Sequence, residues 1–194
     1  MIIFLYGQDS YSLIKYVDEL VARYRKKYPD SFNLHKFDLE EDNADEIRNA
    51  VKGTSFFDDV KFIVAKNPFA KPGIEKTIKE NSIAKEKETV LLLYQTGTEE
   101  ELKKKDQKLF ELLRKESQTK EFKTPTAQAL NKFAANYTAK NKIPVPKKML
   151  DELIKEKGVD FWRLKNELDK IAGFIKSEKK LSDDGIKSLV NFSH

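Results

Sequence analysis

The sequence predicts an α/β fold: a mostly parallel sheet with helices on both faces, followed by a small all-α helical bundle. Short apolar runs alternate with amphipathic segments through the first half of the chain, in the order β, α, β, α, β, α, β. Such alternation is typical of a parallel sheet covered by helices. After Thr124-Pro125 every segment has helical periodicity. We therefore predict two domains, residues 1–124 and residues 125–194.

The first domain opens with a predicted strand and a long helix. Residues 2–6 form a continuous apolar run ended by Gly7, as in a strand buried on both faces. Asp9 is placed to cap the next helix, whose apolar residues recur every three or four positions as far as Lys27. A second strand is expected at residues 33–38.

The remaining elements of this domain are predicted from the same two signals, short apolar runs for strands and apolar residues every three or four positions for helices. Asn43 and Glu46 have the spacing of a capping box, which predicts a short helix that ends at Gly53. Further along we expect a strand at residues 61–65, a short helix at 72–81, a buried strand at 89–94, a helix at 105–115 and an edge strand at 119–122.

Four helices are predicted in the second domain, enough for a small bundle. Thr124 is expected to cap the first helix, with Pro125 in the first helical position. Asp160 and Ser182 are expected to cap the third and fourth helices. The apolar stripes of the four helices cover residues 130–137, 150–154, 161–175 and 186–190.

Charge is distributed unevenly between the two domains. The net charge of the chain is +5. Residues 1–124 contain 23 basic and 23 acidic side chains, whereas residues 125–194 contain 14 and 9. A basic helical domain suits nucleic acid or an acidic partner, and an ordinary lysine-coated surface is the alternative. The candidate DNA-facing residues are Lys132, Lys140, Lys142, Lys147 and Lys148.

Composition also bears on cofactors and location. The chain has no cysteine and only two histidines, His35 and His194, so neither a disulfide nor a zinc site is expected. No apolar run approaches the ~20 residues of a membrane span, and the N-terminal stretch lacks the basic leader of a signal peptide. We expect a cytoplasmic protein with no metal, no cofactor and no membrane partner.

A glycine after the first strand raises the possibility of nucleotide binding at the start of the next helix. A phosphate-binding loop has the pattern G-x-x-x-x-G-K-[ST]. Counted from Gly7, its last three positions fall on Ser12, Leu13 and Ile14, so the glycine, the lysine and the hydroxyl are missing. The third strand ends at Lys66 rather than at carboxylates for magnesium. The sequence predicts a degenerate, non-binding nucleotide site, with a divergent P-loop NTPase as an alternative.

Two adjacent phenylalanines, Phe56 and Phe57, stand between a predicted helix and the third strand. Neighbouring side chains on an extended segment point to opposite sides, so one core does not readily bury both. Either one ring covers the apolar layer and the other is incidental, or the pair projects as a plug into an apolar pocket of another protein. Asp58 and Asp59 are interpreted as solvated charges.

A series of short segments, taken together, resembles the delta subunit of the bacterial DNA polymerase III clamp loader. The segments are FLYGQDSY (4–11), FDLEED (37–42), SFF with the following strand KFIVAKN (55–67), VLLLYQ (90–95), KKDQKLFELL (104–113), EF (121–122) and GVDFWRLKNELDKIAGF (158–174). The resemblance implies a RecA/AAA+-like domain that has lost ATP binding, followed by a small helical, lid-like domain.

The resemblance also implies a non-catalytic function. The family opens the ring-shaped sliding clamp, the beta subunit, by pushing a hydrophobic plug into a pocket on it. That plug aligns with Phe56 and Phe57, with Thr54 and Ser55 at its edge. Implied partners are the clamp, the other clamp loader subunits and primed DNA. Family members continue into a helical collar domain that this sequence does not contain, so collar-mediated assembly is not assigned to these residues.

Overall fold

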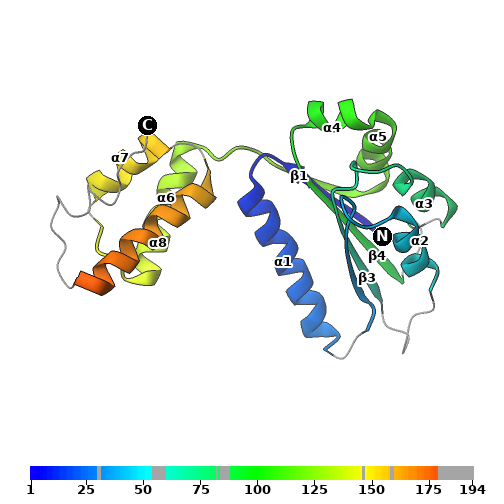
Figure 1. Cartoon of the computed structure of the whole chain (residues 1–194), viewed down its shortest axis with the longest axis horizontal. Coiled ribbons are helices and arrows are strands. Elements are labelled where there is room, and N and C mark those ends of the chain that lie inside the picture. The colour runs from blue at the N-terminus through cyan, green and yellow to red at the C-terminus, as the bar shows by residue number, and fades with distance from the viewer. Residues whose placement is uncertain are drawn as a thin grey trace. The chain divides into compact units, whose positions relative to one another are not determined.

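The computed structural model of the chain describes residues 1–29, 32–53, 60–81, 83, 88–145, 147–157 and 160–178 (Figure 1). The chain divides into two compact units, Met1–Lys123 and Thr124–His194. This division lies one residue from the predicted domain boundary. Among the described residues, no helix combines the length and the apolar character needed to cross a membrane.

A five-stranded parallel sheet forms the centre of the first unit. The strands are β1 (Ile2–Gly7), β2 (Leu34–Asp38), β3 (Lys61–Lys66), β4 (Thr89–Thr96) and β5 (Gln118–Phe122). Their order across the sheet is β2-β3-β4-β1-β5, and each neighbouring pair is parallel. All carboxyl ends therefore lie at one edge of the sheet and all amino ends at the other.

Helices cover both faces of this sheet, as predicted, and Figure 1 shows α1 by itself on one side. The helices of the first unit are α1 (Ser10–Lys27), α2 (Ala44–Lys52), α3 (Ile74–Glu80), α4 (Glu99–Lys105) and α5 (Gln107–Glu116). Phe4 and Tyr6 of β1 belong to the core under α2 to α5, whereas Leu5 belongs to the core under α1. This alternation is the two-residue period of a strand.

Two helix starts in this unit differ from the prediction. The helix predicted at 105–115 is α5, but α4, which precedes it and begins with a capping box between Thr98 and Glu101, was not predicted. At α2 a predicted cap is absent, because Asn43 makes no side-chain capping hydrogen bond. There the Glu46 N–H donates to the backbone carbonyl of Asn43 at 3.0 Å, so the predicted capping box is wrong.

Three helices are described in the second unit: α6 (Ala127–Asn141), α7 (Lys147–Lys157) and α8 (Phe161–Glu178). Leu130, Leu153 and Leu168 lie in the core that the three helices share. The cap of α6 is Thr126, which accepts from the Ala129 N–H at 3.2 Å, and not Thr124 as predicted. Asp160 accepts from the Arg163 N–H at 2.9 Å and is confirmed as the cap of α8. The predicted fourth helix, with its cap Ser182, lies outside the described residues.

Candidate functional site

The turn between β1 and α1 is where a nucleotide phosphate would lie on a sheet of this kind. Gly7 ends β1 with φ of 143°, and a Cβ added there would lie 2.0 Å from the carbonyl oxygen of Phe122. The same carbonyl accepts a hydrogen bond from the Asp9 N–H at 3.0 Å. Backbone from the end of β5 therefore packs directly against this turn, and only glycine fits at position 7.

The N-terminus of α1 already has a negative charge beside it. Asp9 is only 8% exposed, and its carboxylate accepts a hydrogen bond from the Ser12 N–H at 3.0 Å. This confirms the predicted cap, in which a carboxylate satisfies a free N–H and interacts favourably with the helix dipole. A phosphate group at the same place would be repelled by that carboxylate.

Leu13 and Ile14 occupy the positions where a phosphate-binding loop has its lysine and its hydroxyl. Leu13 is fully buried in the core between α1 and the sheet, and Ile14 is 37% exposed. Neither side chain has a hydrogen-bond donor or a metal ligand. The turn therefore has the shape of a nucleotide site without the groups that bind phosphate.

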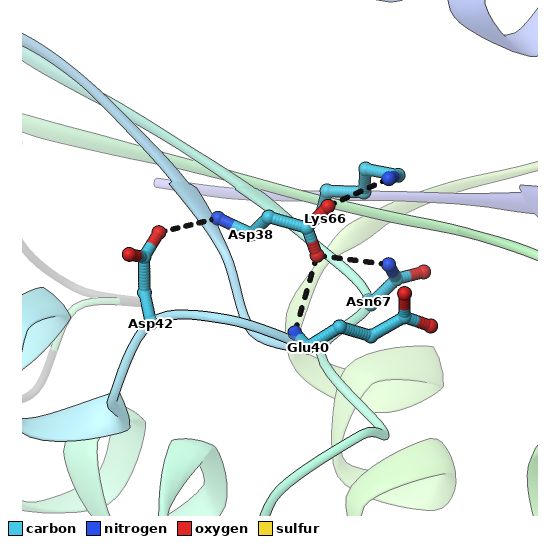
Figure 2. Close-up of polar contacts among 5 residues, drawn as sticks. All are labelled: Asp38, Glu40, Asp42, Lys66 and Asn67. Atoms are coloured by element: carbon cyan, nitrogen blue, oxygen red, sulfur yellow. Dashed lines mark hydrogen bonds and ion pairs between the residues drawn. The ribbon is translucent and has the colours of Figure 1, made fainter.

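A polar cluster lies at the carboxyl ends of β2 and β3 (Figure 2). Lys66 Nζ donates to Asp38 Oδ2 at 2.6 Å, and Asn67 Nδ2 donates to Asp38 Oδ1 at 2.9 Å. The Glu40 N–H donates to the same Oδ1 at 3.1 Å. Both carboxylate oxygens of Asp38 are thus engaged by groups of the chain itself.

Hydrogen bonds to backbone groups hold the acidic turn after β2. The Asp42 carboxylate accepts a hydrogen bond from the Asp38 N–H at 2.7 Å. Lys71 Nζ donates to the carbonyls of Glu41 and Asp42 at 3.1 and 3.0 Å. Among the described residues, no group of three or more histidine, aspartate or glutamate side chains is placed to hold a metal ion.

The Asp38–Lys66 pair shifts the pKa of both partners. Hydrogen bonds from Lys66 and Asn67 lower the pKa of Asp38, and the hydrogen bond to Asp38 raises the pKa of Lys66. Both groups are therefore ionised at neutral pH, and an ammonium stands where hydrolysis would need a magnesium ligand. The sequence identified Lys66 but missed Asp38 as its partner, because only the strand order brings these two strand ends together.

The predicted clamp-binding residues Thr54, Ser55, Phe56 and Phe57 lie outside the described residues, as do Asp58 and Asp59. Their function stays a prediction. The residues on either side are described: Gly53 ends α2, and Val60 directly precedes β3 at the amino edge of the sheet. The carboxyl ends of the strands, with the turn from β1 to α1, lie on the opposite side of the sheet.

A buried lysine connects the two ends of this segment. Lys61 is 6% exposed, and its Nζ donates to the carbonyls of Val51 and Gly53, the latter at 2.9 Å. On the other side, the Tyr24 hydroxyl donates to the Val60 carbonyl at 2.8 Å. The last carbonyls of α2, which have no partner within the helix, are thereby bonded to the first residue of β3. Sequence reasoning gave Lys61 no function, although a lysine opening an apolar strand was a visible signal.

The five lysines predicted to face DNA are all exposed, on α6, on α7 and at the C-cap of α6. Within the part of the chain that the structure describes, none of the five takes part in an ion pair. Lys147 also lines a cavity of about 810 Å³ together with Gln128 and Asn131 of α6 and Asp151 of α7. The second unit thus presents positive charge to solvent.

These features define an α/β domain of AAA+-like fold, in which the turn after β1 lacks the residues of a phosphate-binding loop, followed by helices. Domain III of the replication initiation protein DnaA from Thermotoga maritima matches with a TM-score of 0.69 at 10% identity, covering 98% of this chain and 84% of that one. The DNA clamp loader delta protein of Bacillus subtilis matches with a TM-score of 0.54 at 23% identity, covering 99% of this chain and 58% of that one. At these identities, the similarity shows the fold.

The family is shown by sequence comparison. The family model for the DNA polymerase III delta subunit matches residues 4–123. The DNA polymerase III subunit delta of Bacillus subtilis (strain 168) is 27% identical over 199 residues, covering 96% of this chain and 55% of the relative. The chain belongs to the DNA polymerase III delta subunit family, and it spans little more than half the length of this relative.

Proposed function

We propose that this chain binds the sliding clamp of bacterial DNA polymerase III through Phe56 and Phe57 and favours an open ring. The observation that carries the proposal is the family match over residues 4–123, a range that includes the phenylalanine pair. Opening requires no bond to be made or broken by this chain. It requires only tighter binding to the open or distorted ring than to the closed one.

The contacts around the segment support this function. Gly53 on one side and Val60 on the other are bonded to Lys61 and to Tyr24, which are themselves anchored in β3 and α1. Anchoring both ends of a segment lowers the conformational entropy that the segment can lose on binding.

We propose that ATP acts through the other clamp loader subunits and that this chain is non-catalytic. Three observations support this division. The Asp9 carboxylate occupies the N-terminus of α1, the Leu13 side chain is buried, and Lys66 is paired with Asp38 at the end of β3. The partners that we propose are the clamp, the other loader subunits and primed DNA, in the cytoplasm.

The plug is tested by the double variant Phe56→Ala with Phe57→Ala. Removing two rings that fill a pocket should cost about 2 kcal/mol or more, which is a loss of at least about 30-fold in affinity. The measurement is a calorimetric titration of the clamp into the wild-type chain and into the variant. A cooperative thermal transition in both shows that the fold is intact, and wild-type affinity in the double variant would contradict the proposal.

A second candidate function, contact with primed DNA, is favoured by the exposure of Lys132, Lys140, Lys142, Lys147 and Lys148. Lysines outside ion pairs neutralise phosphates and release counterions, and this makes binding depend steeply on salt. The two candidate functions use different residues, since the phenylalanine pair belongs to the first unit and the lysines to the second.

A further inference from the structure

Trp162, the single tryptophan of the chain, lies on the outer side of α8. Its exposed fraction is 39%, whereas Leu164, Leu168 and Ile171 of the same helix are buried in the core of the second unit. Trp162 and Leu164 are two positions apart, which places them roughly 160° apart around a helix. The core of the second unit therefore does not require a tryptophan at this position.

Half-buried aromatic rings line the seam between α6 and α8, next to Trp162 in the chain. The Phe161 ring of α8 lies 5.0 Å from the Phe133 ring of α6, and the Phe133 ring stacks on the Tyr137 ring at 5.7 Å. The Tyr137 hydroxyl donates to the Asp169 carboxylate of α8. Phe133, Tyr137, Phe161 and Trp162 are called the aromatic seam below. Each of its four side chains keeps part of its surface exposed.

The charge around the aromatic seam is predominantly positive. Lys132, Lys140 and Arg163 are neighbours of seam residues on α6 and α8, and all three are exposed. Within the described residues none of the three takes part in an ion pair. Asp169 accepts from Lys165 Nζ at 2.6 Å, so these two charges compensate each other. A partner of the aromatic seam is therefore expected to be negatively charged.

Aromatic rings bordered by basic side chains suit single-stranded nucleic acid. Its bases have free faces that stack on a ring, and its phosphates are neutralised by lysine and arginine. In a duplex both faces of each base are covered by neighbouring bases. Protein interfaces also use aromatic rings, but they are depleted in lysine, whereas two exposed lysines border these rings. The chemistry of the surface thus favours a single strand over a duplex or a protein.

We propose that Trp162 is a stacking platform for a base of single-stranded DNA, the unpaired part of a primed template. Lys132, Lys140 and Arg163 contact the phosphates of the same strand. The inference rests on the second candidate function, contact with primed DNA, and it names the form of DNA and a residue that binds a base. Because every base has a flat face, this contact tolerates any sequence.

The single tryptophan makes the contact observable in the unmodified full chain. A base stacked on the indole ring quenches its fluorescence, so oligo-dT of about 15 nucleotides should quench Trp162 at about 50 mM salt. An abasic oligonucleotide of the same length has the same phosphates without the bases. It should bind more weakly and leave the fluorescence unchanged. A blunt duplex of that length should also leave it unchanged.

Variants measure what the ring contributes to affinity, by fluorescence anisotropy of labelled oligo-dT. Trp162→Ala should bind about 5- to 150-fold more weakly. The slope of log K against log salt should stay at the wild-type value, because no phosphate contact is lost. Trp162→Phe keeps a ring and should have an affinity between the two. Phe32→Ala removes an aromatic side chain that is 77% exposed in the first unit, and this matched control should bind as wild type.

The outcomes separate the inference from the candidate function on which it rests. Binding of oligo-dT without quenching, or wild-type affinity in Trp162→Ala, would overturn the inference and leave the lysine contacts with DNA in place. Equal quenching by the abasic oligonucleotide would also overturn it, since charge alone would explain the signal. A chain that binds no DNA at low salt would overturn both. If thermal melting shows that Trp162→Ala is unfolded, Trp162→Phe and the quenching of the wild-type chain decide.

Discussion

Lys61 places an ammonium group where little water reaches it, at the amino end of β3. A buried cation is costly unless its donors are used, and here two of them serve the Val51 and Gly53 carbonyls. Those carbonyls lie at the C-terminus of α2, where the helix dipole also favours positive charge. The side chain thus fixes the distance between the end of α2 and the start of β3.

Replacing this residue by an apolar one of similar length tests that account. Lys61→Met leaves the two carbonyls without their donor, so the free energy of unfolding should fall by about 1 to 3 kcal/mol, measured by urea denaturation. Clamp affinity should fall as well, because the ends of the plug segment are no longer tied. Lys52→Met, on the exposed side of α2, is the control. Equal stability in the two variants would mean that the buried hydrogen bonds of Lys61 make no net contribution to the free energy of unfolding.

Between elements, the Asp38–Lys66 ion pair joins the edge strand β2 to β3, and it makes stability depend on pH. The pKa of Asp38 lies below its ordinary value of 3.8 in the folded chain. Its ionised form therefore stabilises the fold above that value, and the contribution disappears as pH falls through the lowered pKa. Because the Lys66 side chain is 45% exposed, Asp38→Asn should cost at most about 1 kcal/mol near pH 7. Urea titrations should show this difference shrinking from pH 4 downward, and a difference independent of pH would refute it.

Elements were easier to predict from the sequence than the contacts between them. Burial is encoded locally, so the apolar run at 2–6 and the stripe of α1 predicted their elements correctly. Thr98 and Glu101 also carried a local signal for α4, which was overlooked. The Asp38–Lys66 contact depends on the order of strands, which the alternation of β and α does not specify.

At the scale of the whole molecule, the net positive charge lies in the second unit, and the residues proposed to bind the clamp lie in the first. The acidic and basic side chains of residues 1–124 balance, and the net charge of +5 comes from residues 125–194. The residues proposed to bind the clamp, Phe56 and Phe57, belong to the first unit. The exposed lysines proposed for DNA belong to the second. The two functions should therefore be separable by substitution.

Replacing Lys132, Lys140, Lys142, Lys147 and Lys148 by glutamine tests this separation. Binding to primed DNA, followed by fluorescence anisotropy from about 50 to about 200 mM salt, should weaken. Each lost phosphate contact should make the slope of log K against log salt shallower by about 0.9. Clamp affinity should stay at the wild-type value, because glutamine at exposed positions leaves the first unit untouched. Glutamine at five exposed lysines of the first unit, Lys15, Lys26, Lys104, Lys105 and Lys108, removes the same charge and should leave the slope unchanged. If the two sets change the slope equally, the effect is one of overall charge, and the helical unit has no dedicated DNA surface.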